Sequence, residues 1–115
     1  MEDKRIIDEI VLQLSNFRFS RYSMAYQYLI DAIYIVVKDR NTMRDLPIAK
    51  RYNTRAENVQ WSLTKLVDIM YTNTPAKTMY NYFNFFIDEK PTLKFFIITV
   101  ARNVYSKINK KYIYY

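Results

Sequence analysis

The side chains between residues 58 and 65 are the best candidates for recognition chemistry. Carboxamides such as Asn58 and Gln60 can each make a bidentate contact to adenine, and a ring such as Trp61 can lie against thymine methyl groups. Thr64 and Lys65 complete the set of five candidate base-reading residues. Because none of the five is an arginine, the commonest guanine contact is missing, and we expect an A·T-rich double-stranded DNA target.

Basic residues flank this stretch, and the whole chain carries a formal net charge of +7. A charge of this sign makes an anionic partner the first expectation, with double-stranded DNA ahead of other candidates. The predicted phosphate contacts are Arg40, Arg44, Lys50, Arg51 and Arg55. On the candidate face itself, Glu57 and Asp68 oppose Lys65, so a simple count there gives −1 and the flanking cations must outweigh it.

Catalytic and cofactor chemistry has little support in this composition. The chain has no histidine and no cysteine, which excludes zinc fingers and histidine-based triads, and it has no glycine for a phosphate-binding loop. Its carboxylates show no paired spacing with a base or a metal-ligand set. We therefore expect no enzyme, no cofactor and no metal site.

No apolar run approaches the roughly 18 residues that cross a bilayer. The amino terminus also has no apolar signal core. We expect a cytoplasmic protein without membrane contact.

Apolar spacing indicates an all-α protein, a single compact domain over residues 1–115 with six helices. Helical spacing of apolar residues and the positions of polar breaks and prolines define the segments. The second segment has the widest apolar stripe and is expected to be the most buried. The expected helices cover about 6–14, 24–37, 46–52, 54–71, 75–86 and 90–110.

The third and fourth helices predict a helix-turn-helix over about residues 46–71. A polar loop over 40–45 precedes a short helix that tolerates Pro47 in its first turn, and Asn53 breaks it. The sequence from Thr54 to Glu57 then matches a capping box, in which the hydroxyl and the carboxylate each satisfy a backbone N–H at a helix start. Pro75 is expected at the first position of the fifth helix.

Residues 48–54, Ile-Ala-Lys-Arg-Tyr-Asn-Thr, resemble the IAKKYNT segment in the C-terminal DNA-binding domain of the master sporulation response regulator of endospore-forming bacteria. Residues 6–10, 26–33, 90–92 and 96–97 are similar to further blocks of that domain in the same order. The resemblance implies a six-helix domain whose fourth helix enters the major groove. It also implies a role in transcription and neighbouring copies on tandem sites.

The chain departs from this family in two respects. The family regulator carries a receiver domain, whereas this sequence starts a few residues before its first expected helix, so we expect no phosphorelay control within it. In the recognition helix, family arginines are replaced by Asn58, Trp61 and Thr64, and the family histidine by Lys65. We expect a changed target.

A second hypothesis stays open, in which the fold serves as a protein interaction module without specific DNA reading. Trp61 would then pack under a loop or against a partner, because large exposed aromatics are favoured at interfaces. The partner in this hypothesis is another protein or a second copy of the chain, as in a homodimer. The aromatic residues of the last two helices are expected in the core or at a helical dimer interface: Tyr80, Tyr82, Phe83, Phe85, Phe86, Phe95 and Phe96.

Overall fold

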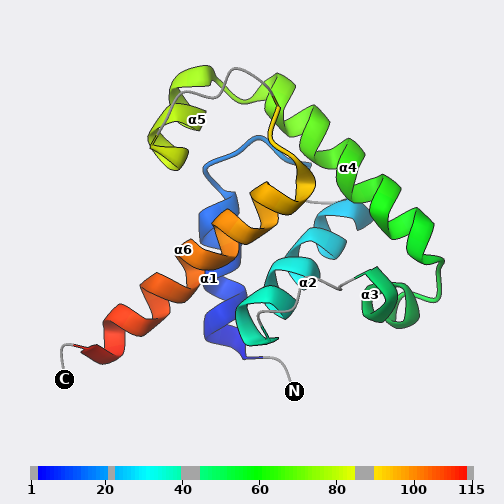
Figure 1. The fold of residues 1–115 in the computed structure, drawn as a ribbon, viewed down its shortest axis with the longest axis horizontal. Helices are drawn as coiled ribbons and strands as arrows, with labels where there is room; N and C mark the ends of the chain where they lie inside the picture. Colours follow the sequence, from blue (N-terminus) through cyan, green and yellow to red (C-terminus); the bar gives the residue numbers. More distant parts are fainter. Residues whose placement is uncertain (1–2, 21–22, 40–44, 85–89, 114–115) are drawn as a thin grey trace.

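The computed structural model describes residues 3–20, 23–39, 45–84 and 90–113. Within these ranges the chain is helical and contains no strand, which confirms the all-α prediction. The helices are α1 (Lys4–Leu14), α2 (Met24–Asp39), α3 (Asp45–Arg51), α4 (Ala56–Asn73), α5 (Ala76–Phe83) and α6 (Leu93–Ile113). Figure 1 shows α3 and α4 on one side of the molecule, with the carboxyl-terminal end of α6 on the opposite side.

Helix α2 is the centre of the fold, because it packs against α1, α3, α4 and α6. The prediction that this helix is the most buried is confirmed. Its buried residues are Tyr26, Tyr28, Leu29, Ile30, Asp31, Ala32, Ile33, Val36 and Val37. Burial of its apolar side chains from several sides provides the main hydrophobic stabilisation of the core.

The start of α4 differs from the predicted capping box. Arg55 is the N-cap residue, and its side chain makes no capping hydrogen bond. The Thr54 hydroxyl instead accepts a hydrogen bond from the side-chain carboxamide of Asn58, at 3.1 Å. The Glu57 carboxylate lies 3.4 Å from the Arg55 guanidinium. The capping box is therefore wrong, because both of its side chains have other partners.

The ends of α4 and α5 also depart from the prediction. Pro75 is the N-cap of α5 and not its first helical residue. Thr74 is buried, and its hydroxyl accepts a hydrogen bond from the backbone N–H of Arg18, at 3.0 Å. Helix α5 stops at Phe83, because Asn84 adopts the left-handed conformation with φ 62° and donates to the Tyr80 carbonyl. Helix α6 begins at Leu93, later than expected.

Aromatic side chains join α5 to the rest of the core. Phe17, Tyr82, Phe83 and Phe96 form a cluster with ring centroids 4.7–6.2 Å apart. Core positions are thus confirmed for Phe83 and Phe96. Burial raises the pKa of Tyr82 to about 12, and its hydroxyl donates to Gln13 at 2.9 Å.

Among the other aromatic residues considered for the core, Tyr80 and Phe95 are exposed. Phe85 and Phe86 lie outside the described residues.

Candidate nucleic-acid interface

A four-residue turn, Tyr52 to Arg55, joins α3 to α4. Asn53 has φ 53°, in the left-handed region. Its N–H donates to the Lys50 carbonyl at 3.4 Å, and the Thr54 N–H donates to the Ala49 carbonyl at 2.9 Å. This pair of hydrogen bonds is a Schellman motif, which usually has glycine at the left-handed position. In a chain without glycine, asparagine takes this place, and the predicted break at Asn53 is confirmed.

Apolar side chains fix the inner faces of both helices. Ile48 and Ala49 of α3 are buried, and so are the α4 residues Val59, Leu63, Leu66, Val67 and Met70. Because α3 packs against both α2 and α4, the short helix is anchored on the core. The opposite side of α4 is consequently left to polar and exposed residues.

The five candidate base-reading residues lie together on α4 and are named here the reading face: Asn58, Gln60, Trp61, Thr64 and Lys65. All five are exposed. Trp61 is 64% exposed, so the expectation that it points away from the core is confirmed, and it does not pack beneath any described loop. At about 100° per residue, the five positions fall within one half of the helix circumference.

Local contacts orient several side chains of the reading face. The Lys65 ammonium lies over the Trp61 ring, 4.8 Å from its centroid, in a cation–π contact. The Thr64 hydroxyl donates to the Gln60 carbonyl at 2.9 Å, which leaves its oxygen able to accept. The arrangement presents an aromatic surface, a cation and two carboxamides toward solvent.

The predicted phosphate contacts fall into three groups. Lys50 and Arg55 are exposed beside the turn, and the Arg55 side chain is 81% exposed. Arg51 is also exposed, but its guanidinium lies 3.4 Å from the carboxylate of Asp31. Arg40 and Arg44 lie outside the described residues.

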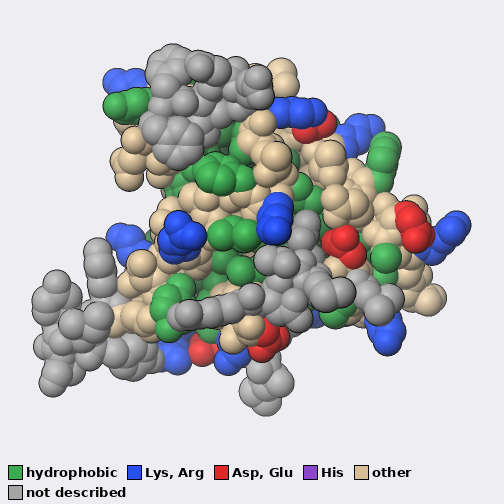
Figure 2. Space-filling view, in the orientation of Figure 1, with side chains coloured by type: hydrophobic (Ala, Val, Ile, Leu, Met, Phe, Trp, Pro, Cys, Tyr) green, Lys and Arg blue, Asp and Glu red, His purple; other side chains and the backbone are tan. Residues whose placement is uncertain are grey.

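Both acidic residues near the reading face have basic partners. Glu57 pairs with Arg55 at 3.4 Å, and Asp68 with Lys90 at 3.0 Å. Exposed pairs of this kind are weak, so the Arg55 guanidinium can leave the Glu57 carboxylate and bind a DNA phosphate instead. On the side of α3 and α4, Figure 2 shows basic and acidic side chains interspersed. The count of −1 for the bare face therefore overstates its repulsion of DNA.

Sequence reasoning missed two features next to this face. The first is Asp31, which is buried in α2 and accepts hydrogen bonds from Tyr52 and Arg51. A carboxylate within an otherwise apolar stripe is a sequence signal that could have indicated a buried, partnered residue. A hollow of about 230 Å³ also lies beside Trp61, lined by side chains that include Phe19, Leu66 and Ile69. Its walls come from segments far apart in the sequence, so periodicity could not indicate it.

The described part of the chain offers neither a metal site nor a membrane span. No group of three or more carboxylate, histidine or cysteine side chains there is arranged to hold a metal ion. No helix within the described ranges is both long and apolar enough to cross a membrane.

A short helix, a tight turn and a longer helix with an outward polar face have the layout of a helix-turn-helix. The family described as Sporulation initiation factor Spo0A C terminal matches residues 10–104. The chain belongs to this family, which confirms the resemblance found in residues 48–54. Membership implies a DNA-binding effector domain that regulates transcription. No curated protein matches the sequence significantly.

Proposed function

We propose that this chain is a sequence-specific regulator of transcription that binds double-stranded DNA with the reading face in the major groove. The observation that carries the proposal is the exposure of all five reading-face residues on the second helix of the helix-turn-helix. A helix in this position places its amino-terminal residues against base edges. Each of the five lies in the first ten residues of α4.

Two sets of residues have separate roles in this proposal. Lys50, Arg51 and Arg55, with Arg40 and Arg44, hold the DNA backbone and set the orientation of the domain. Phosphate contacts of this kind carry no sequence information themselves. Asn58, Gln60 and Trp61 then read base edges and methyl groups, with Thr64 and Lys65 beside them.

The target is proposed to differ from that of the family regulator. Helix α4 contains no arginine, and Lys65 is the only cation of the reading face. Arginine is the commonest guanine reader, whereas asparagine and glutamine pair with adenine. We therefore infer an A·T-rich target.

Binding selection from a random duplex pool tests this proposal. Enrichment of one A·T-rich motif is the expected result. Recovery of sequences with no shared motif would contradict it. Enrichment of a G·C-rich motif would refute the assignment of the readers while leaving specific binding intact.

A second candidate function, protein interaction through the reading face, is favoured by one observation. Trp61 is 64% exposed and borders the hollow of about 230 Å³, and such apolar surfaces often mark interfaces. The last two helices also carry three exposed aromatic residues, Tyr80, Phe95 and Tyr105.

Sedimentation at several protein concentrations tests self-association, including a homodimer or tandem copies. A concentration-dependent rise in mass that Trp61→Ala abolishes, without any effect on DNA affinity, would favour this second function over the first. An unchanged monomer mass at every concentration would remove the homodimer.

A further inference from the structure

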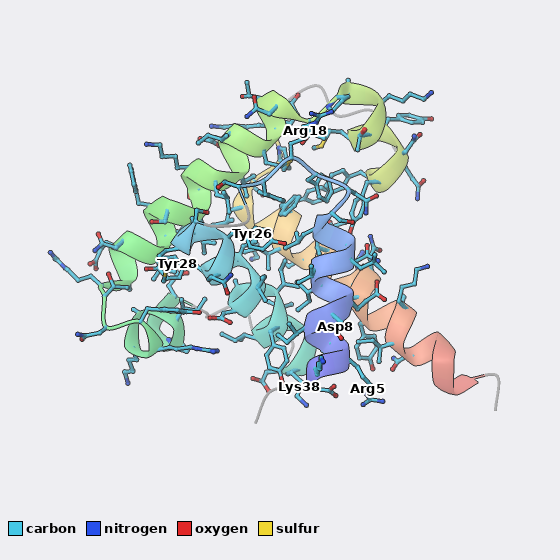
Figure 3. The ribbon with its side chains drawn as sticks, turned by 180° about the vertical axis from the view of Figure 1, so that it is seen from behind. Arg5, Asp8, Arg18, Tyr26, Tyr28 and Lys38 are labelled. Carbon is cyan, nitrogen blue, oxygen red and sulfur yellow. The ribbon has the colours of Figure 1, made fainter. Side chains whose placement is uncertain are left out.

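Asp31 links the core to the end of α3 and the turn that follows. One of its carboxylate oxygens accepts a hydrogen bond from the Tyr52 hydroxyl at 2.7 Å, and the other lies 3.4 Å from the Arg51 guanidinium. The Tyr52 ring also packs edge-on against Tyr28, with centroids 5.1 Å apart. Figure 3 shows Tyr28 on the part of α2 that lies beside α3. Helix α2 therefore holds both residues that precede Asn53.

Burying the Asp31 carboxylate costs free energy of folding, because the charge is removed from water. Asp31 is only 8% exposed, within a helix whose other buried residues are apolar or aromatic. A buried charge needs partners to offset its desolvation, and a well-packed apolar side chain is often as stable or more so. Stability alone is thus a weak reason for aspartate here, whereas a fixed geometry of the turn is a sufficient one.

We propose that Asp31 is a positioning residue for DNA recognition, which sets the direction of α4 by holding Arg51 and Tyr52. The inference rests on the proposed function. Base-edge contacts tolerate little displacement, since recognition geometry must be held to within about 0.5 Å. Phosphate contacts by long, flexible side chains tolerate more. Loss of Asp31 therefore reduces discrimination between sequences more than it reduces overall affinity.

Because Asp31→Asn removes a negative charge, it should affect affinity for the selected site and for scrambled DNA differently. In Asp31→Asn the negative charge beside Arg51 is removed, so the repulsion of a phosphate near this guanidinium falls. Affinity for scrambled DNA should stay constant or rise, while affinity for the selected site falls. A variant that only destabilised the fold would weaken binding to both DNAs together.

The test compares Asp31→Asn with Asp8→Asn, which changes the net charge equally. Asp8 is exposed on α1, and Figure 3 shows it far from α3. We expect the ratio of affinities for the selected and scrambled duplexes to fall at least about tenfold in Asp31→Asn, as for one misaligned base contact, and to be unchanged in Asp8→Asn. An unchanged ratio in Asp31→Asn would overturn the proposal, and so would equal weakening on both DNAs.

Tyr52→Phe provides a second variant that keeps the charge and removes one hydrogen bond. A smaller fall in the same ratio is expected, and no fall in a folded variant would count against the proposal.

Hydrogen exchange separates this inference from the proposed function. The Thr54 N–H donates to the Ala49 carbonyl at 2.9 Å within the turn, so its exchange reports on the turn without DNA. It should exchange faster in Asp31→Asn than in Asp8→Asn, and equal rates would refute the positioning role. Absence of sequence preference in the wild-type protein would instead refute the proposed function, and the exchange comparison would still decide whether Asp31 holds the turn.

Discussion

Replacing Trp61 with alanine separates DNA recognition from folding. Because 64% of this residue is exposed, only about a third of it packs against the domain. Truncating a fully buried tryptophan costs about 3–5 kcal/mol, so we expect a loss of unfolding free energy of about 1–2 kcal/mol. The variant should remain folded, which a urea titration followed by circular dichroism will show.

The expected effect on recognition is larger. A contact that distinguishes one base pair is worth about 1–3 kcal/mol, so Kd for the selected duplex should rise roughly 5- to 150-fold in Trp61→Ala. Affinity for scrambled DNA should change little, since the variant keeps every cation. Fluorescence anisotropy with labelled duplexes measures both values.

Ile69→Ala is the matched control for Trp61→Ala. This residue lies two turns further along α4, and its side chain is also exposed. It should leave both affinities unchanged. Wild-type affinity of Trp61→Ala for the selected duplex would refute the assignment of this helix face to base reading.

Three further predictions concern charge, backbone and protonation. Arg55→Ala should weaken binding to every duplex by a similar factor and lower the slope of log K against log salt by about one, whereas Lys77→Ala on α5 should not change the slope. Asn53→Ala should cost about 1–2 kcal/mol in denaturant titration because of its positive φ, and Asn53→Gly should cost less than about 1 kcal/mol; similar losses for both would contradict the role given to the turn. The raised pKa of Tyr82, about 12, means that the folded state holds this proton more tightly than the unfolded chain, so its stabilising contribution is present below pH 10 and is lost between pH 10 and 12. The unfolding free energy of wild type should fall more steeply across that window than that of Tyr82→Phe, and parallel curves would refute the burial argument.

Helix content and most of the core follow from local sequence patterns. The apolar stripe of α2 and the alternation of inner and outer residues on α4 have the helical period, and the structure places both as expected. The break at Asn53 is also predictable from the sequence, since asparagine is one of few residues that adopt a left-handed conformation readily.

Helix ends are harder to predict, because the polar side chains beside them have several possible partners, some nearby and some distant in the sequence. The Thr54 hydroxyl accepts a hydrogen bond from the Asn58 side chain. The Thr74 hydroxyl accepts one from the backbone N–H of Arg18, which is 56 residues away in the sequence. Neither choice is visible in a four-residue motif. The capping box failed because the nearby residues Asn58 and Arg55 pair with its two side chains, whereas the role of Thr74 depends on a segment distant in the sequence.

The exposed residues of the candidate site are predictable from the sequence, whereas the contacts that hold the turn beneath them are not. Helical spacing alone places Trp61 and Lys65 on one outer face of α4, and their cation–π contact is a local i, i+4 pair. The link from Asp31 to Tyr52 joins α2 to the turn after α3 across 21 residues, so no local pattern indicates it. The same holds for the hollow beside Trp61.

Titration of the selected duplex against a scrambled duplex, at two salt concentrations, tests the central claim most directly. The proposed function predicts at least about a 10³-fold preference for the selected sequence, with part of that preference retained at the higher salt. Binding that ignores sequence and disappears with added salt would show only the attraction of a chain of net charge +7 for phosphate, and would contradict specific recognition by the reading face.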